Sequence, residues 1–314
     1  MLKTRAEAFA PASIANLGVG FDILGLALDG AGDVVEAEWR DDGQIVIAEI
    51  RGDEGKLSHD PQKNIVGIAA QALLGQLHSK RGVTLRLKKG LPLSSGLGGS
   101  AASAVAAVMA VNGLLEKPLA REDLLAAALE GEAAVSGYHA DNVAPSLFGG
   151  IILANGITID RIHRLPVPSD LHLALVTPNV EVPTAQARAV LPSTVPLRQL
   201  VRQTGAVADL VDAIHCGDVV RMARAMEADE VIEPARAHLM PYIDEVRHEA
   251  KLNGALALVI GGAGPTLCAV CQRWDIAESV ALAMRRVYDR HGLACQMRHT
   301  TVSAQGAQLL TTHL

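Results

Sequence analysis

The chain has 314 residues, a formal net charge of −6 and 49% hydrophobic residues, which is enough apolar material for one or two packed domains. Acidic and basic residues are mixed along the chain, and there are only two Trp, three Tyr and three Phe. This composition disfavours nucleic-acid binding, which depends on a basic stripe and stacking aromatic rings.

The N-terminus and the cysteines predict a cytoplasmic protein. The first residues, MLKTRAEAFAPAS, lack the apolar segment of a secretory signal peptide, and four cysteines in so long a chain do not form the pattern of a disulfide framework. Cys268 and Cys271 have metal-type spacing but lie in an apolar run that is typical of a strand. Because strand residues three apart point to opposite faces, we predict core cysteines and no metal site.

The N-terminal segment predicts strands around a polar loop. Residues 4–10 alternate as a strand does, and a turn-rich loop follows at 11–22. In this loop Asn16 and Asp22 either belong to an ordinary wide turn or face a polar ligand. Further strands are predicted at residues 24–28, 35–39 and 45–47, with turns at 29–30 and 41–43. We expect these strands to form an antiparallel meander.

The next elements lead to a stretch without charged residues. A helix is predicted at residues 65–77 with Asn64 as its N-cap, and a strand at 83–87. Residues 91–115, LPLSSGLGGSAASAVAAVMAVNGLL, then form a Ser/Gly loop followed by an Ala/Val helix. The uninterrupted small and apolar residues of that helix predict that it is buried.

The glycine loop predicts a phosphate site. Gly96, Gly98 and Gly99 allow tight turns and let an anion approach the main-chain amides. The first amides of the following helix have no intrahelical acceptor, and the helix dipole favours negative charge there. We therefore interpret the loop as the place where the phosphates of a nucleotide bind.

The same stretch has three other possible interpretations. A membrane span is disfavoured by Pro92 and by an apolar core of only about eleven residues. A dinucleotide fingerprint, Gly96-x-Gly98-x-x-Ala101 with Glu116, is disfavoured because its acidic residue belongs at the end of a second strand. A flexible linker before a core helix is the remaining alternative.

A second polar segment follows a helix predicted at residues 122–135. In YHADNVAPSLFGG, residues 138–150, the side chains of His139, Asp141 and Asn142 either cap a helix end or form part of a polar site. A hairpin is predicted at residues 151–162. The proline-containing segment 165–170 then predicts a domain boundary, which divides the chain into residues 1–166 and 167–314.

The second part predicts a split βαβ arrangement. Strands are expected at residues 171–176, 255–260, 266–271 and 294–302. Helices are expected at residues 183–191, 196–215, 217–229, 239–253 and 275–291. Without the extra helices, the order is β-α-β-β-α-β, so the fold class is α+β with two domains.

Four ordered segments resemble one family. They are PASIANLGVGFDILGLAL at 11–28, LPLSSGLGGSAAS at 91–103, HADNVAPSLFGG at 139–150 and GGAGPT at 261–266. The chain resembles homoserine kinases, of the superfamily that includes galactokinase, mevalonate kinase and phosphomevalonate kinase. The resemblance implies ATP-dependent phosphorylation of the side-chain hydroxyl of L-homoserine, giving O-phospho-L-homoserine in threonine biosynthesis.

The same resemblance implies a fold and an assembly. The N-terminal domain would be a mixed sheet with helices, like domain 2 of ribosomal protein S5, and the C-terminal domain would be ferredoxin-like with extra helices. A homodimer is expected, acting on the small molecules homoserine and ATP, with neither nucleic acid nor membrane as a partner.

For ATP and Mg²⁺, the resemblance implies a set of contacts. Asn64 would lie near the adenine. The phosphate loop would comprise Pro92, Leu93, Ser94, Ser95, Gly96, Leu97, Gly98, Gly99, Ser100, Ala101 and Ala102. Ser100 and Glu132 would hold Mg²⁺, which prefers oxygen ligands, with Glu130 as the alternative to Glu132. Gly99 stands where the family usually has a serine, and so does Gly261.

For homoserine, the resemblance implies a zwitterion site. Arg188 and Arg236 would bind the carboxylate. The groups around the amine and the hydroxyl would be Asn16, Asp22, His139, Asp141 and Asn142, with Gly262 allowing close backbone approach. Either Asp141 takes the hydroxyl proton as a general base, or Asn142 only orients the hydroxyl, since phosphoryl transfer demands little basicity.

Two other functions stay open at this point. One is a related kinase acting on mevalonate, a sugar or shikimate, and the other is a catalytically silent regulatory protein on the same fold. An acidic residue at position 22 opposite two arginines favours an amino acid as substrate.

Overall fold

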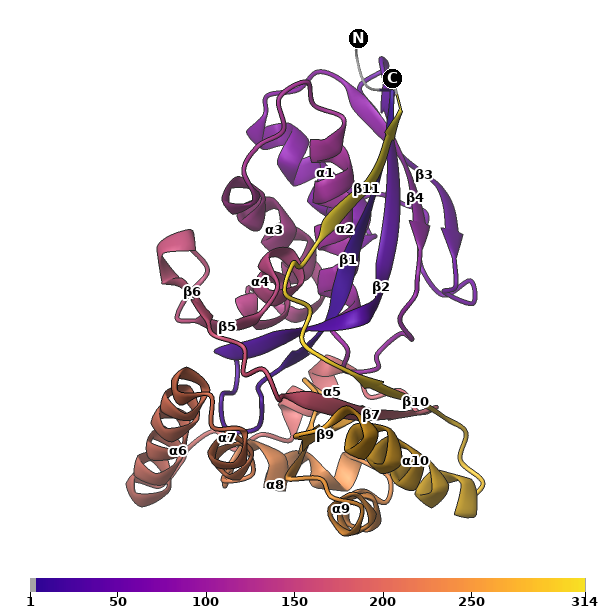
Figure 1. Cartoon of the computed structure of the whole chain (residues 1–314). Helices are drawn as coiled ribbons and strands as arrows, with labels where there is room; N and C mark the ends of the chain where they lie inside the picture. The colour runs from indigo at the N-terminus through magenta and orange to yellow at the C-terminus, as the bar shows by residue number, and fades with distance from the viewer. Residues whose placement is uncertain (1–3, 314) are drawn as a thin grey trace.

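The first sheet joins strands from both ends of the chain, as Figure 1 shows. The computed structural model describes residues 4–313. The strands of this sheet are β1 (Arg5–Ala15), β2 (Leu24–Arg40), β3 (Ile45–Arg51), β4 (Gly82–Lys88), β5 (Ile151–Ala154), β6 (Ile162–Leu165) and β11 (Gln308–His313). Their order is β11-β1-β2-β4-β3, with β5 paired to β2 and β6 to β5.

The predicted antiparallel meander is wrong in two respects. Strand β3 pairs with β4 in parallel, at the edge of the sheet, and not with β2. Parallel neighbours need a crossover, and helix α1 (Ile65–Gln76) provides it. The two strands expected on either side of residues 29–30 are one strand, β2, which bulges where Pro11 and Ser13 of β1 pair with Gly32 and Ala27.

Four helices cover one face of the first sheet (Figure 1). They are α1, α2 (Gly99–Gly113), α3 (Leu125–Ser136) and α4 (Ala140–Phe148), with a 3-10 turn, Arg121–Leu124, before α3. Helix α2 packs on β1 and β2, and its residues from 101 to 113 are all buried, which confirms the buried helix predicted there. Helix α4 starts within the segment 138–150, so its polar side chains lie at the beginning of a helix.

The second sheet has the order β10-β7-β9-β8, with every neighbouring pair antiparallel. Its strands are β7 (His172–Pro178), β8 (Ala257–Ile260), β9 (Leu267–Cys271) and β10 (Cys295–Thr300). The third of these strands in chain order lies between the first and the second, which is the predicted split βαβ arrangement. The α+β fold with two units is therefore confirmed.

Six helices accompany the second sheet. They are α5 (Thr184–Ala189), α6 (Leu197–Cys216), α7 (Val219–Met226), α8 (Ile232–Arg236), α9 (Ile243–Leu252) and α10 (Trp274–Arg290). Helices α9 and α10 cover one face, while α6 and α7 pack in a core that also includes β1 and β2 of the first unit (Figure 1). The short α8 and a 3-10 turn after it occupy the interval before α9 where no helix was predicted.

The positions of Cys268 and Cys271 confirm that their side chains point to opposite faces of one strand. Cys268 belongs to the core between the two units, whereas Cys271 belongs to the core beneath α10. Both thiols are buried, and burial raises the pKa of each to about 12. The two side chains therefore face opposite sides of β9, as expected for residues three apart in a strand.

Two segments near the ends of the predicted domains differ from expectation. Strand β6 begins at Ile162 because residues 159–161 form a 3-10 turn. Strand β11 was not predicted, and it pairs with β1 in the first sheet although residues 167–314 were assigned to the second domain. The division of the chain between residues 166 and 167 stays a prediction. Strand β11 does not follow this division, because it belongs to the first sheet. Within residues 4–313, no helix has both the length and the apolar character to cross a membrane.

Candidate active site

A cavity of about 320 Å³ lies where the two units meet. It brings together segments that are far apart in the chain: the 11–22 loop, the glycine loop, the end of α3, the start of α4, α5, α8 and the 261–266 turn. The predicted residues that line it are Asn16, Asp22, Asn64, Pro92, Leu93, Ser94, Ser95, Gly96, Gly98, Gly99, Ser100, Glu132, His139, Asp141, Asn142, Arg188, Arg236 and Gly262. Three predicted residues, Leu97, Ala101 and Ala102, are buried and do not line the cavity.

Backbone hydrogen bonds connect the three glycine-containing loops. The bonds run from Ser13 N to Leu97 O (3.1 Å), from Thr266 N to Ser95 O (3.1 Å) and from Gly262 N to Ala15 O (3.2 Å). Gly98 immediately precedes α2 and has φ +61°, and a Cβ there would lie 2.0 Å from Ser13 Oγ. The loop is therefore fixed by its neighbours, and position 98 requires glycine.

A buried ion pair supports the loop from below. Lys89 and Asp33 form an ion pair, and Lys89 also donates to Gly99 O at 2.9 Å and to Ser103 Oγ at 3.0 Å. Asp33 accepts from Gly90 N at 2.9 Å. Lys89 lines the cavity, so it is a charged group that the sequence analysis missed. The sequence feature that could have identified Lys89 is its position directly between a buried strand and the glycine loop.

Ser100 and Glu132 are the two residues that were predicted to hold Mg²⁺. Glu132 on α3 is 3% exposed, and burial raises the pKa of its carboxyl, against hydrogen bonds from Ser100 and Ser136. Its Oε2 is buried without a hydrogen-bond partner in the described part of the chain. Glu130 is exposed and accepts from the Tyr138 hydroxyl at 3.0 Å, outside the residues that line the cavity.

This donor set fits a hard cation. A buried carboxylate oxygen that lacks a donor, next to a hydroxyl, offers the oxygen ligands that Mg²⁺ prefers while leaving room for water and phosphate oxygens. Residues 4–313 contain no group of three or more His, Cys, Asp or Glu side chains that could hold a metal ion by themselves. A cation here would therefore share its ligands with a bound phosphate.

Asp22 and Arg188 form a two-bond ion pair at the other end of the cavity. The guanidinium donates Nη1 and Nη2 to the two carboxylate oxygens at 3.0 and 2.8 Å. This is the bidentate geometry that arginine and carboxylate favour. His139 Nδ1 lies 3.6 Å from Asp22 Oδ2, and burial lowers the pKa of His139 in spite of that carboxylate. This end of the cavity therefore offers a negative charge for the ammonium group of a zwitterion and a positive charge for its carboxylate.

Arg236 is almost completely buried beside this pair. It is 3% exposed and donates to Ala187 O at 2.9 Å and Gly262 O at 3.0 Å. The Phe21 ring, which the sequence analysis did not single out, lies 5.1 Å from the Arg236 guanidinium and 5.4 Å from that of Arg188. Stacking on one ring holds the two cations in place.

Asn16 organises the 11–22 loop. Its backbone has φ +74°, its Oδ1 accepts from Asp22 N at 3.1 Å, and its Nδ2 donates to Gly262 O at 2.9 Å. The Oδ1 atom therefore closes the 11–22 loop on itself, and the Nδ2 atom connects this loop to the 261–266 turn at the cavity wall. The residue lines the cavity and also fixes its shape.

Asp141 and Asn142 lie at the start of α4. Asp141 is 3% exposed, and burial, followed by the negative charges of Asp22 and Glu132, raises its pKa to about 7. Asn142 Oδ1 accepts from Ser13 Oγ at 2.8 Å, so a hydroxyl that the sequence analysis missed holds the Asn142 side chain. A carboxyl with a pKa near neutrality next to a fixed amide can exchange a proton with an alcohol or orient it.

Asn64 caps α1 as predicted. Its Oδ1 accepts from Val66 N at 3.1 Å, and its Nδ2 donates to Ser58 O at 2.7 Å. Residues that line the cavity but were not predicted include Ser58, Lys63, Ile65, Ser103, Ser136, Val182 and Thr184. Except for Ser103, which ends the 91–103 segment, these residues lie outside the four segments that carry the family resemblance.

Comparison with known proteins places the chain in a family. The GHMP kinases N terminal domain matches residues 64–150, and the GHMP kinases C terminal domain matches residues 198–290. A homoserine kinase of Chloroherpeton thalassium is 39% identical, over 96% of this chain and 98% of its own. A homoserine kinase of Arabidopsis thaliana is 45% identical, over 91% of this chain and 79% of its own.

Solved structures agree. The crystal structure of a homoserine kinase from Cytophaga hutchinsonii superposes with a TM-score of 0.94 at 39% identity, over 99% of this chain and 98% of that chain. A mevalonate kinase of L. major, solved with R-mevalonate, shares the fold with a TM-score of 0.72 at 18% identity, over 96% and 97% of the two chains. The chain therefore belongs to the homoserine kinase family within the GHMP kinases.

Proposed function

We propose that this protein transfers the γ-phosphoryl group of ATP to the side-chain hydroxyl of L-homoserine, and that the reaction takes place in the cavity between the two units. The observation that carries the proposal is the arrangement in one cavity of a glycine loop at a buried helix N-terminus, a carboxylate–hydroxyl pair and a two-arginine site. Family membership supports the substrate, since the relatives named above are homoserine kinases.

The glycine loop and the start of α2 bind the triphosphate. The loop is held by hydrogen bonds to two neighbouring loops, and the amides that begin α2 have no acceptor within the helix. Asn64, at the start of α1, is expected near the adenine, and its place in the cavity wall supports this assignment. Because phosphoryl transfer depends mainly on positioning and on neutralising charge, a rigid set of donors at this point lowers the barrier.

Ser100 and Glu132 hold Mg²⁺ in this proposal. The support is the buried Glu132 oxygen that has no hydrogen-bond partner in residues 4–313 and its contact with the Ser100 hydroxyl. When bound, the ion neutralises the negative charge that develops on the phosphate oxygens. Lys89, directly below the loop, is paired with Asp33 and holds the Gly99 carbonyl at the start of α2.

The homoserine zwitterion binds at the Asp22–Arg188 end. Arg188 and Arg236 receive the carboxylate, and Asp22 and the residues near it receive the ammonium group. Both charges need partners because an unpaired ion in a closed site is costly. The support is the pairing of Asp22 with Arg188 and the burial of Arg236 beside them.

Asp141 and Asn142 act on the substrate hydroxyl. Asp141 has a pKa near 7, so at neutral pH it can accept the hydroxyl proton as the new O–P bond forms. Asn142, held by Ser13, orients the same hydroxyl. The two roles are compatible, and substitution of each residue separates them.

The proposed assignment of residues to the ATP and homoserine sites, which we call the site map, is tested by replacing Arg236 with alanine. We expect the KM for homoserine to rise at least tenfold, about the loss of one charged hydrogen bond, with the KM for ATP unchanged. A coupled ADP-release assay with each substrate varied in turn gives both values. Equal increases in both KM values would refute the separate binding of the two substrates, and turnover with another alcohol but not with homoserine would refute the substrate.

Two further features belong to this proposal. We place the protein in the cytoplasm, because its four cysteines are free thiols, as in reducing compartments. We also propose a homodimer, as expected from the family resemblance. Size-exclusion chromatography with light scattering measures the assembly directly.

A further inference from the structure

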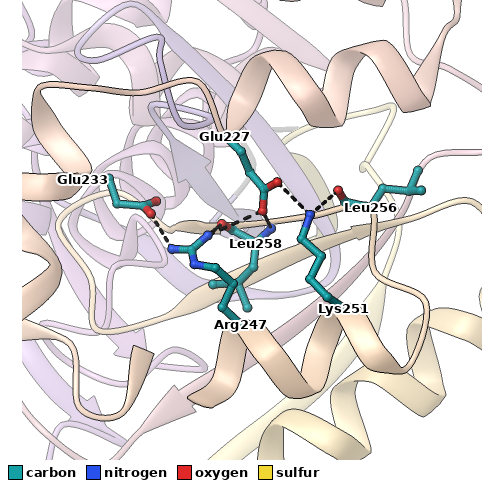
Figure 2. Close-up of polar contacts among 6 residues, drawn as sticks. All are labelled: Glu227, Glu233, Arg247, Lys251, Leu256 and Leu258. Atoms are coloured by element: carbon teal, nitrogen blue, oxygen red, sulfur yellow. Dashed lines mark hydrogen bonds and ion pairs between the residues drawn. The ribbon is translucent and has the colours of Figure 1, made fainter. Parts of the chain in front are cut away.

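A group of charged side chains connects α7, α8 and α9 behind the cavity. We call it the α7–α9 charge cluster: Glu227, Glu233, Arg247 and Lys251 (Figure 2). Arg247 pairs with Glu233 of α8 and approaches Glu227 at 3.5 Å, and it also donates to the carbonyl of Leu258. Lys251 pairs with Glu227 at 2.7 Å. None of these residues was predicted to have a function.

The cluster attaches these helices to the free edge of the second sheet. Strand β8 is the last strand of the order β10-β7-β9-β8, so its outer edge has no neighbouring strand within residues 4–313. Glu227 accepts from Leu258 N at 2.8 Å. Burial raises the pKa of Glu233, while Arg247 and the backbone of Ile260 favour its charged form. The Glu227 carboxylate thus takes the place of a neighbouring strand's carbonyl, and the two carboxylates fix α7 and α8 to the sheet.

Helix α8 depends on this attachment. It has only five residues, Ile232–Arg236, too few for a helix to be stable by itself. Asp229 accepts from three amides at its start, those of residues 231, 232 and 233, at 2.7 to 3.0 Å. At its other side, the Glu233–Arg247 ion pair is partly shielded from water, with the two side chains 21% and 27% exposed.

The last residue of the same helix is Arg236, which reaches the cavity. Arg236 lies three positions after Glu233, which is less than one helical turn. Its guanidinium bonds to Ala187 O and Gly262 O and lies over Phe21, so a small rotation of α8 would move it out of register with both carbonyls.

We propose that Arg247 is a positioning residue for substrate recognition, acting through Glu233 to hold α8 so that Arg236 lies correctly in the cavity. The inference rests on the proposed contact of Arg236 with the homoserine carboxylate. Arg247 itself lies outside the residues that line the cavity. Its effect is therefore confined to the substrate end, while the glycine loop at the ATP end is held by other contacts.

The test compares Arg247→Met with Arg236→Ala and with the double variant. We expect Arg247→Met to raise the KM for homoserine about tenfold, with the KM for ATP within about twofold of the parent value. In the Arg236→Ala background the same substitution should add less than about twofold, because the group that it positions is already gone. A general loss of stability would not produce this dependence on Arg236.

A second pair of variants keeps the test independent of folding. Glu233→Gln keeps the shape of the side chain and removes the charge that pairs with Arg247, so it should reproduce the effect on homoserine if Arg247→Met does not fold. Lys251→Met is the matched control. Lys251 contacts Glu227 and the Leu256 carbonyl at the β8 end of the cluster, and its loss should leave the KM for homoserine unchanged.

The outcomes separate the two proposals. If Arg236→Ala raises the KM for homoserine but Arg247→Met and Glu233→Gln leave it unchanged, the positioning role is refuted and the site map stands. Equal increases in both KM values, or full additivity in the double variant, also refute it. If Arg236→Ala itself has no effect on homoserine, the proposed site is wrong and the positioning role falls with it.

Discussion

Replacing Asp141 with asparagine should stabilise the free protein, by an amount that increases with pH. Burial raises the pKa of Asp141 from 3.8 to about 7, so the folded chain binds this proton more tightly than the unfolded chain does. The stability from this group is fully present below about pH 3.8 and is lost as the pH rises to about 7. The total loss is about 4 kcal/mol, at roughly 1.36 kcal/mol per pKa unit.

The variant does not suffer this loss because asparagine cannot ionise. Between pH 5 and pH 8, the difference in free energy of unfolding between variant and parent should change by about 2 to 3 kcal/mol in favour of the variant. Urea titrations at the two pH values measure it, with EDTA present and without nucleotide. Glu278→Gln, an exposed carboxylate on α10, is the control and should show no such change.

Two results would refute the reasoning. A difference between Asp141→Asn and the parent that stays constant from pH 5 to pH 8 would mean that the carboxyl is not held neutral by its surroundings. A variant that becomes less stable as the pH rises would mean that the charged form is the one that the fold stabilises. The same variant informs the mechanism, since a large fall in kcat supports a general base and a small one supports orientation by Asn142.

Three further predictions concern the ATP end. Glu132→Gln should lower kcat more than about tenfold and raise the Mg²⁺ concentration that is needed, and an unchanged Mg²⁺ titration would contradict the metal site. Gly98→Ala should raise the KM for ATP, since its Cβ would lie 2.0 Å from Ser13 Oγ, and unaltered ATP kinetics would show that the loop adapts. Lys89→Met should lower the free energy of unfolding by about 3–5 kcal/mol because Asp33 is left buried and unpaired. Urea unfolding checks this value, and a loss below about 1 kcal/mol would disagree with it.

Several features of the fold followed from local sequence patterns. The charge-free run from Ala101 to Gly113 specifies a helix buried on all sides, since no face of it is suited to water. The spacing of Cys268 and Cys271 in an apolar strand places them in two different cores. Asn64 caps α1 because its short polar side chain reaches the helix amides. These features depend on residues close together in the chain.

Contacts between distant segments were not predictable in the same way. Strand β3 alternates as an antiparallel strand would, and only its pairing with β4 makes it parallel. The contact of Ser13 with Asn142 and the ion pair of Lys89 with Asp33 join residues that are far apart in the chain. The type of a residue and its neighbours in the sequence do not reveal which distant residue it contacts. Such contacts depend on how the sheet is assembled.

The glycine loop could be interpreted as a phosphate site from its residue types alone, because glycines and free helix amides favour an anion. The proposed roles of Asp141, Asn142 and the two arginines came from the family resemblance. The way in which these groups are held depends on the packed fold. It sets the pKa of Asp141 through burial, and it ties Arg236 to the edge of the second sheet through Glu233 and Arg247. Burial and long-range ion pairs depend on the whole packed chain, which local sequence patterns do not encode.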